Sequence, residues 1–471
     1  MTKQRLQRPP SQYGFWSGAL FGTVTGMASL LTFQYLFGIL RRPRLLSKAI
    51  LLGEEQFDNE QALAVFIATE SLRSGIQPRR LTTHSSREVL HAGYRNFSES
   101  WARDFGFAAF GLLTLKQYTP IKETLEAFFY HQTPQGQLPV KLHSVNVVTR
   151  FLHSFFEREQ PNELMLKPKY LSGHGAPSLD GQALLVIAAL AYTQESGNKQ
   201  FLEEHWAKLQ AAMQWLGTYR KATGEDPLLY QGAFADWADS IARHGRVLYT
   251  NVVYWKALSE MAIAANRLNL HEESIEYFVQ AEKVLRAINR HFWREDLGYF
   301  VTSDDLLHLS SDGNLLAIAW GLAKREQAES VLGVMERARM AEPVPTRVTY
   351  PSYPRHLIAL ENLLGGVANY HTDASWLWIG AWHVIALVKI GHMEAAQTLV
   401  SRILNVIVQD RQVHEVHGPN GKPLSSMWYT AEAPLTWNAG MVLYACHVFE
   451  NKRQEEQTSH LLSNLFHKST E

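Results

Sequence analysis

The chain has 471 residues, and its 45 Lys and Arg residues balance its 45 Asp and Glu residues, so the formal net charge is zero. This balance argues against a nucleic-acid-binding protein, which would carry a basic excess. Hydrophobic residues make up 46% of the chain and charged residues 19%, which provides for a large core and excludes a mainly disordered protein. The single cysteine, Cys446, excludes an intramolecular disulfide and a cysteine-rich metal site.

A long uncharged segment near the N-terminus predicts a membrane-spanning helix. Residues 9–40 contain no Asp, Glu, Lys or Arg. Within them, residues 15–40 are apolar and, at about 1.5 Å per residue, long enough to cross a hydrocarbon core of roughly 30 Å. Arginines at 41, 42 and 44 follow directly, which favours a single-pass membrane protein whose main domain faces the cytoplasm. The alternative is a hydrophobic helix that packs on the rest of the chain.

Four glycines in this segment follow one another at every fourth residue, namely Gly14, Gly18, Gly22 and Gly26. They leave one helix face without side chains, as at close helix–helix contacts in lipid, and so suggest a homodimer. The alternative is that glycine is simply common in membrane helices.

From residue 54 to residue 450 the sequence reads as a series of amphipathic helices separated by polar, Gly- and Pro-containing loops. The predicted helices cover residues 58–73, 100–115, 120–131, 181–196, 200–219, 249–267, 271–291, 313–323, 326–338, 373–391, 393–409 and 435–450.

Buried and half-exposed helices follow one another in this series. Residues 181–196 are apolar on nearly every side, whereas residues 200–219 are polar on one side. A two-layered helical barrel requires such pairs, so twelve helices predict an all-α fold, an (α/α)6 barrel of six hairpins. The predicted domains are a membrane anchor (1–48), the barrel (49–451) and a polar C-terminal tail (452–471).

The densest chemical signal is the segment Gln231-Gly-Ala-Phe-Ala-Asp-Trp-Ala-Asp-Ser240, in which Asp236 and Asp239 flank Trp237. A carboxyl group beside a tryptophan is partly desolvated, and its raised pKa lets it hold a proton near neutral pH. Such a group can protonate a leaving glycosidic oxygen. The alternative is that the two aspartates cap a helix.

A second carboxylate is expected near the C-terminus, and two glutamates compete for this role. Glu415 lies in a Gly-, Pro- and Asn-containing loop over residues 413–423. Glu432 lies at the entrance to the last helix, where a carboxylate would also complement the helix dipole. The residues alone leave this choice open.

Two further groups have more than one interpretation. His414 and His417 have a spacing suited to a metal, but Glu415 is the only further ligand that the loop offers, so neither a metal nor a cofactor is predicted. Arg103 beside Asp104 is either a buried ion pair or a clamp on sugar hydroxyl groups.

Several segments resemble a known superfamily in the same chain order. They are Trp101-Ala-Arg-Asp104, Asp180-Gly-Gln-Ala-Leu-Leu-Val-Ile, Trp237-Ala-Asp-Ser240, Gly313-Asn-Leu-Leu-Ala-Ile318, Asn369-Tyr-His-Thr-Asp-Ala-Ser-Trp376, and the loop His414-Glu-Val-His-Gly-Pro-Asn-Gly followed by Thr436-Trp437. With them the chain resembles the six-hairpin glycosidases over roughly residues 90–450. It is most similar to neutral/alkaline invertases and to the amylo-1,6-glucosidase part of glycogen-debranching enzymes.

The resemblance implies an inverting glycoside hydrolase that cleaves an α-glucosidic bond in a small saccharide or glucan branch. It implies Asp239 as the general acid and Glu415 as the general base. The residues expected to hold or line the saccharide are Arg103, Asp104, Asp180, Asp236, Trp237, Asn314, His371, Trp376, Trp378, Glu432 and Trp437. Invertases usually carry two arginines after their general acid, whereas Ser240 and Ile241 stand here, which argues against sucrose.

Two other functions stay open from the sequence. A sugar epimerase can use the same type of barrel, with histidines moving the protons. A catalytically inactive, membrane-tethered glycan-binding protein would keep the aromatic cleft and lose the reaction.

Overall fold

The computed structural model describes residues 32–41, 57–156, 158–161, 163–221 and 226–468. Within them, six inner helices form a closed ring in which each contacts the next and the last returns to the first. The inner helices are α3 (Ala102–Thr114), α6 (Leu179–Ser196), α8 (Leu248–Arg267), α10 (Ser311–Ala319), α13 (Leu377–Ile390) and α15 (Thr436–Lys468).

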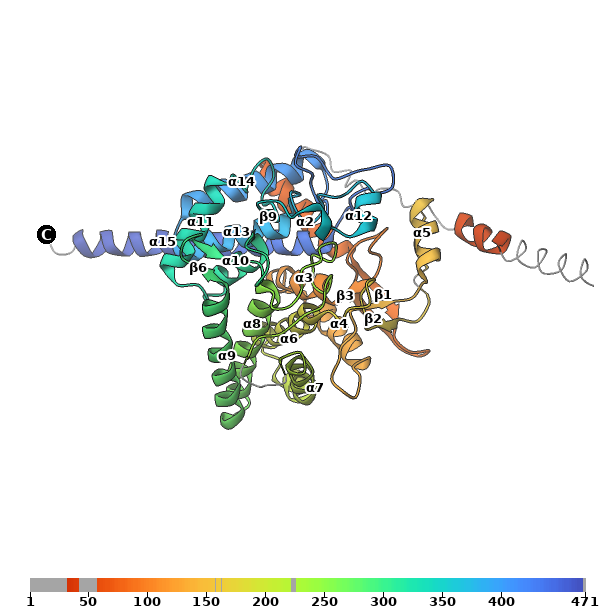
Figure 1. Ribbon diagram of the computed structural model, residues 1–471, viewed down its shortest axis with the longest axis horizontal. Helices are drawn as coiled ribbons and strands as arrows, with labels where there is room; N and C mark the ends of the chain where they lie inside the picture. Colours follow the sequence, from red (N-terminus) through yellow and green to blue (C-terminus); the bar gives the residue numbers. More distant parts are fainter. Residues whose placement is uncertain (1–31, 42–56, 157, 162, 222–225, 469–471) are drawn as a thin grey trace, which may run out of the picture.

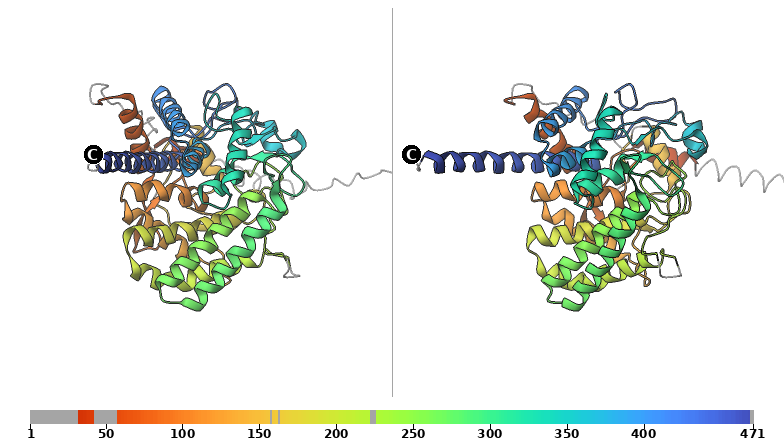
Figure 2. Two further views of the ribbon diagram at one scale, coloured as in Figure 1. Left: turned by 90° about the vertical axis from the view of Figure 1, so that its left-hand side faces the viewer. Right: turned by 60° about the vertical axis from the view of Figure 1, so that its left-hand side comes forward.

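A second layer of helices packs outside this ring (Figures 1 and 2). The outer helices are α2 (Glu60–Ser74), α4 (Tyr118–Tyr130), α7 (Lys199–Gly217), α9 (His271–Phe292), α11 (Arg325–Arg337) and α14 (Met393–Asp410). In chain order each outer helix precedes one inner helix, and the two form a hairpin. The described chain therefore forms six hairpins. The predicted (α/α)6 architecture is confirmed.

The two layers follow from the hydrophobic pattern of the helices. Helix α6 is buried on almost all sides, as its apolar run over residues 183–190 requires, while the outer helix α9 buries only one side. The hydroxyl of Ser178 accepts a hydrogen bond from the backbone N–H of Gly181 at the start of α6, and Gly197 ends it with a φ of +69°.

All twelve predicted helices occur, and apart from the end of the last one their ends differ from the prediction by at most four residues. The sequence pattern missed two short helices, α5 (Val147–Phe155) and α12 (Leu360–Leu364), and a 3₁₀ turn at Arg355–Leu357. Helix α15 also continues to Lys468, past the predicted start of the tail at residue 452, and extends beyond the barrel (Figure 1).

Short antiparallel strands in the loops modify the all-α prediction. They are β1 (Ile76–Arg80) with β2 (Ser86–Leu90), β3 (Ser100–Trp101) with β4 (Lys141–His143) and β5 (Lys167–Lys169), β6 (Trp293–Arg294) with β7 (Tyr299–Phe300), and β8 (Leu309–Ser310) with β9 (Thr349–Tyr350). Strand β3 leads directly into α3 and positions Trp101 at the start of this helix.

The structure contradicts the predicted membrane-spanning segment. Among the residues that the structure describes, no helix is both long and apolar enough to cross a bilayer. The described part of the segment is a helix over residues 32–41, whose length at about 1.5 Å per residue is about half of a hydrocarbon core of roughly 30 Å. Its Tyr35 hydroxyl donates a hydrogen bond to Thr149 of α5.

The predicted single-pass membrane location, with its cytoplasmic main domain, is therefore wrong. Residues 15–31 of the predicted span lie outside the described residues. So does the face formed by Gly14, Gly18, Gly22 and Gly26, and nothing in the structure supports the predicted homodimer.

Candidate active site

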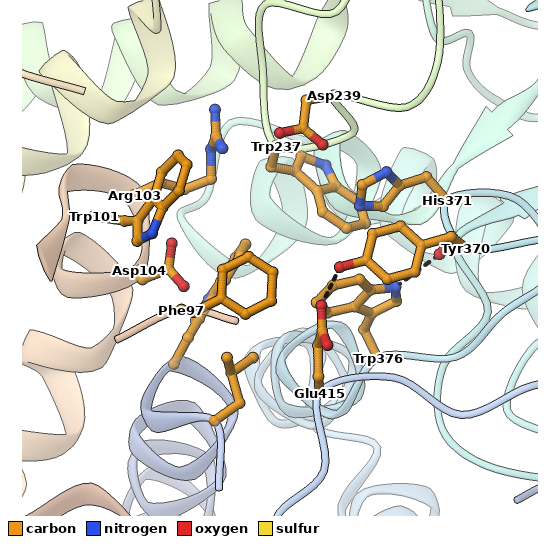
Figure 3. A pocket seen from close by; sticks show the side chains of 12 residues that line it. Phe97, Trp101, Arg103, Asp104, Trp237, Asp239, Tyr370, His371, Trp376 and Glu415 are labelled. Carbon is orange, nitrogen blue, oxygen red and sulfur yellow. Dashed lines mark hydrogen bonds between the residues drawn. The ribbon is translucent and has the colours of Figure 1, made fainter. Parts of the chain in front are cut away.

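A pocket lies where the inner helices begin (Figure 3). Its lining consists of Phe97, Trp101, Arg103, Asp104, Trp237, Asp239, Tyr370, His371, Trp376, Glu415, Leu435 and Trp437. It holds about 470 Å³ of space that atoms do not fill, its open side included. Aromatic rings form most of the wall, and they suit the apolar face of a sugar ring.

The first turn of α3 supplies two charged groups with different surroundings. Arg103 donates two hydrogen bonds to Asp180, from Nε at 2.5 Å and from Nη2 at 3.0 Å. Burial would raise the pKa of the Asp180 carboxyl, but Arg103 holds it below its usual value. The Arg103 side chain is therefore fixed before any ligand arrives.

Asp104, the next residue, is left facing the cavity (Figure 3). Among the described residues, no other residue donates a hydrogen bond to its carboxyl group. Burial raises the pKa of Asp104 to about 7, although the neighbouring Arg103 opposes this shift. Its carboxyl group is thus available to a polar group of a ligand.

Asp239 reaches the cavity from the connection between α7 and α8. The carboxyl group of Asp239 accepts no hydrogen bond from the described residues. Burial raises the pKa of Asp239 to about 6, with Arg103 acting in the opposite direction. A carboxyl group with such a pKa can hold a proton close to neutral pH and release it to a bound group.

Glu415 enters the cavity from the connection between α14 and α15, on a different side from Asp239 (Figure 3). The hydroxyl groups of Tyr370 and Tyr429 both donate hydrogen bonds to its carboxylate, and the backbone N–H of Glu432 donates a third at 2.8 Å. Burial raises the pKa of Glu415 to about 7, and these three hydrogen bonds limit the rise. Burial raises the pKa of both tyrosine hydroxyls well above the usual value, so they stay protonated donors.

His371 is a neutral hydrogen-bond donor in the pocket wall. The backbone N–H of Ser240 donates to its Nδ1 at 3.4 Å, and the Ser240 hydroxyl lies 2.9 Å from the same atom. A backbone N–H can only donate, so Nδ1 is the acceptor and the ring proton is on Nε2. Burial lowers the pKa of His371 well below its usual value, which keeps the ring uncharged.

Of the thirteen residues expected at the site from the sequence, eight line this pocket and five do not. Asp180 bonds Arg103, as described above. Asp236 is buried and accepts hydrogen bonds from Nε and Nη2 of Arg243 at 2.8–3.0 Å. Asn314 is fully buried and bonds the backbone of Phe300.

Glu432 is the fourth residue outside the lining. Its carboxylate accepts hydrogen bonds from three successive backbone N–H groups, those of Tyr94, Arg95 and Asn96, at 2.6–3.0 Å. It therefore holds the segment that leads to Phe97, one wall of the pocket. The fifth residue, Trp378, is fully buried and packs edge-on against Trp237 with ring centroids 4.9 Å apart.

Sequence reasoning missed five residues that shape the site. Phe97, Trp101, Tyr370 and Leu435 line the pocket, and Tyr429 supports Glu415. Trp101 and Tyr370 stand inside the segments that carry the family resemblance, next to predicted site residues, and this position was the available signal. Tyr429 lies fourteen residues beyond Glu415 in a loop without any such signal.

No group of three or more His, Cys, Asp or Glu side chains in the described parts of the chain is arranged to hold a metal ion. His417 Nε2 lies 2.9 Å from a carboxylate oxygen of Asp410, which gives it a structural partner.

A family model described as the bacterial alpha-L-rhamnosidase six-hairpin glycosidase domain matches residues 138–342. No curated protein sequence gives a significant match. Among solved structures, a rhamnosidase from Klebsiella oxytoca with rhamnose bound superposes with a TM-score of 0.60 at 13% identity, over 83% of this chain and 64% of the rhamnosidase. The chain thus spans less than two thirds of that protein.

Two other structures are matched over almost their whole length. A family 63 mannosylglycerate hydrolase from Thermus thermophilus in complex with glucose has a TM-score of 0.57 and 15% identity, over 80% of this chain and 98% of the hydrolase. A glycosidase variant in complex with glucose has a TM-score of 0.56 and 15% identity, over 85% of this chain and 99% of the variant.

Structural likeness at such low identity shows the fold alone, and the narrower resemblance to invertases and amylo-1,6-glucosidases stays a prediction. The family model, however, starts before α6 and ends after α11, so it includes the loop that carries Asp239. Together with the closed ring of six hairpins, this match supports the resemblance of the chain to the six-hairpin glycosidases, a superfamily of glycoside hydrolases.

Proposed function

We propose that the protein is an inverting glycoside hydrolase that removes an α-linked glucosyl residue from a small saccharide or a glucan branch. One observation carries this proposal: two carboxyl groups, Asp239 and Glu415, enter the same pocket from different sides and have different partners. Asp239 has no described hydrogen-bond donor, whereas Glu415 has three. Pairs of carboxyl groups in unlike environments take unlike roles in glycoside hydrolysis.

In the proposed reaction Asp239 acts as the general acid. Its proton passes to the glycosidic oxygen while the bond between this oxygen and the anomeric carbon breaks. Glu415, held by its three donors, takes a proton from a water molecule, whose oxygen forms the new bond to the anomeric carbon. The products are the free sugar with inverted configuration and the leaving alcohol, and the reaction leaves Asp239 ionised and Glu415 protonated.

The groups around this pair are suited to hold one sugar ring. Asp104 offers an acceptor without a described donor, and His371 offers the Nε2 proton as a donor. The ring faces of Trp376 and Trp437 supply apolar contact area in the same wall. Asp180 contributes indirectly, because it fixes the guanidinium group of Arg103.

The similar proteins support more than one identity for the sugar. Two of the similar structures contain glucose, which favours a glucoside. The family model and the Klebsiella structure concern rhamnosidases, and the Thermus enzyme is a mannosylglycerate hydrolase. These relatives make α-L-rhamnosides and mannosylglycerate the main competitors.

A substrate panel tests the proposal. We expect release of glucose from isomaltose or a branched glucan, and no release from α-L-rhamnosides or mannosylglycerate. Glu415→Gln serves as the inactive control, and the same samples are assayed for epimerised sugar. Epimerisation without hydrolysis, or no turnover of any α-glucoside, would contradict the proposed activity.

Proton NMR of the fresh product tests the mechanism. Inversion requires carboxyl groups about 6.5–9.5 Å apart with room for water, whereas retention requires about 5–5.5 Å. From the proposed single displacement we expect β-glucose as the first product from an α-glucoside, before mutarotation. A first product in the α configuration would refute the single displacement even if both carboxyl groups proved essential.

A further inference from the structure

A buried ion-pair cluster lies directly behind the loop that carries Asp239. Its centre is Arg243, which is 1% exposed and donates hydrogen bonds to two carboxylates. Asp236 accepts from Nε and Nη2, and Asp312 accepts from Nη2 at 2.8 Å. Burial alone would lower the pKa of the Arg243 guanidinium, but the two carboxylates raise it well above its usual value. The cluster is thus built around a buried arginine that stays charged.

The first ion pair closes the loop of the general acid. Asp236 precedes Asp239 by three residues, and Arg243 follows it by four. The bidentate bond between Asp236 and Arg243 therefore joins the two ends of an eight-residue loop, with Asp239 near its middle. Gln231 also donates to Asp236, at 2.7 Å, and extends the support before the loop.

The second ion pair anchors this closed loop to the barrel. Asp312 lies in the first turn of α10, and besides Arg243 it accepts a hydrogen bond from the indole N–H of Trp237. Trp237 lines the pocket and lies two residues before Asp239. A single carboxylate thus holds the loop at two points, one on each side of the general acid.

Asp312 itself is not part of the pocket lining. It is 1% exposed, and its other oxygen accepts hydrogen bonds from the Ser310 hydroxyl and from the backbone N–H of Gly313, the latter at 2.6 Å. These bonds fix the carboxylate on the rigid end of α10, so its position is set by the barrel and not by the loop. It has no direct route to a ligand.

We propose that Asp312 is a positioning residue for the general acid: it fixes the carboxyl group of Asp239 through Trp237 and Arg243, and so determines how well the leaving oxygen is protonated. This inference rests on the proposed function, in which Asp239 is the acid. A buried ion pair adds little net stability compared with an apolar replacement. A selective effect on the protonation of the leaving group therefore distinguishes a positioning role of Asp312 from a merely structural role.

A second arginine of the same connection offers a matched control. Arg246 also bonds two aspartates, Asp226 at 3.1 Å and Asp304 at 2.7 Å. Asp304, like Asp312, belongs to a later segment of the chain and holds the connection between α7 and α8. Neither Arg246 nor its partners line the pocket. Asp304→Asn therefore removes an arginine–aspartate ion pair of the same connection, one that is more exposed than the Arg243–Asp312 pair, without touching the support of Trp237.

The test compares a substrate that needs protonation of its leaving group with one that needs little. For a glucosidase these are isomaltose and α-D-glucosyl fluoride, and for any other sugar selected by the panel they are its methyl glycoside and its fluoride. In Asp312→Asn we expect kcat for the unactivated substrate to fall at least tenfold, with KM within threefold. We expect kcat for the fluoride to change less than threefold. In Asp304→Asn the ratio of the two kcat values should stay within twofold of the wild type.

Equal losses on both substrates, or no loss on the unactivated one, would overturn the inference. Arg243→Lys is the second variant, because lysine keeps the charge but cannot bond both carboxylates in a fork. If Asp312→Asn does not fold, Arg243→Lys takes its place in the test, and we expect it to show the same selective loss on the unactivated substrate. Failure of the proposed function has a separate signature, namely an Asp239→Asn variant that loses activity equally on both substrates.

Discussion

The backbone N–H of Glu432 donates a hydrogen bond to Oε2 of Glu415 at 2.8 Å, and the backbone N–H of Glu415 donates to the carbonyl oxygen of Glu432 at 2.9 Å. The two glutamates that compete for the role of base in the sequence are thus direct neighbours with different tasks. The Glu415 side chain faces the pocket, while the Glu432 side chain is used by the backbone of residues 94–96.

This arrangement predicts opposite effects for two conservative substitutions. Glu415→Gln should lower kcat by about 10²–10⁴-fold, the usual contribution of a general base, with little loss of stability. Glu432→Gln should lower the free energy of unfolding by about 1–3 kcal/mol, because the amide nitrogen that replaces one carboxylate oxygen cannot accept a hydrogen bond from the backbone N–H groups of residues 94–96. It should keep measurable activity. Steady-state kinetics and thermal unfolding of both variants check this, and an active Glu415→Gln beside an inactive Glu432→Gln would reverse the assignment.

The pKa values of the two proposed catalytic groups predict a narrow pH optimum. Asp239, with a pKa of about 6, must be protonated while Glu415, with a pKa of about 7, is ionised. Because the acid has the lower pKa, the productive form is less populated than the form in which Glu415 carries the proton and Asp239 is ionised. It makes up about one-twentieth of the enzyme at pH ~6.5, where kcat/KM should be greatest.

The assignment of the acidic limb of the pH profile to Glu415 and of the alkaline limb to Asp239 can be tested with α-D-glucosyl fluoride. In Asp239→Asn the activity should depend on Glu415 alone, so it should rise with pH through about 7 and then stay constant. The wild type should instead decline on both sides of its optimum. An Asp239→Asn variant that retains the alkaline decline would show that another group provides the acid.

The two tyrosines that bond Glu415 are expected to tune its protonation. Tyr429→Phe removes a donor that favours the ionised carboxylate, so the pKa of Glu415 should rise further above its usual value. If the rise is about one unit, or 1.4 kcal/mol, kcat/KM at the optimum should fall about fivefold to tenfold, and the optimum should move to higher pH. Tyr299→Phe is the control, because its hydroxyl bonds the carbonyl of Leu307 away from the pocket. An unchanged pH profile in Tyr429→Phe would contradict this role.

The barrel was predictable because its signal is repeated and local. Apolar runs such as residues 181–196 and one-sided patterns such as residues 200–219 alternate along the chain, and packing decides their layers directly. Helix α5 was missed because it is only nine residues long, and its apolar face, which includes Val147, Phe151 and Phe155, is exposed and adds nothing to the core of the barrel. The N-terminal prediction rested on the lack of charge alone, and no helix among the described residues is long and apolar enough to cross a bilayer.

The site was predictable where its residues begin inner helices, as Arg103 and Asp104 do at α3 and Trp437 does at α15. It was less predictable where a carboxylate could face either a ligand or the protein. The sequence places both Asp104 and Asp236 among the residues expected to hold the saccharide. Only the three-dimensional position of Arg243 shows that Asp236 is already paired and that Asp104 is not.

The position of Asp104 in the pocket predicts a cost in stability that depends on pH. Because burial raises the pKa of its carboxyl group to about 7 from an ordinary value of 3.8, the folded state binds a proton more tightly than the unfolded state. The Asp104 carboxyl group therefore lowers the free energy of unfolding progressively as the pH rises from about 4 to about 7. Asp104→Asn removes this dependence. Relative to the wild type, the variant should gain stability over this range, reaching about 2 kcal/mol at pH 8 after allowance for the open side of the pocket.

Chemical denaturation of the wild type and Asp104→Asn at pH 4.5 and pH 8 measures this difference. The exposed Asp58→Asn serves as the control, and its difference from the wild type should be the same at both pH values within about 0.5 kcal/mol. The Asp104→Asn variant should also bind the sugar more weakly and raise KM, since a carboxylate acceptor is replaced by a neutral amide. A stability difference for Asp104→Asn that does not grow with pH would show that the Asp104 carboxyl group is already satisfied within the protein, and its place among the sugar-binding groups would then be lost.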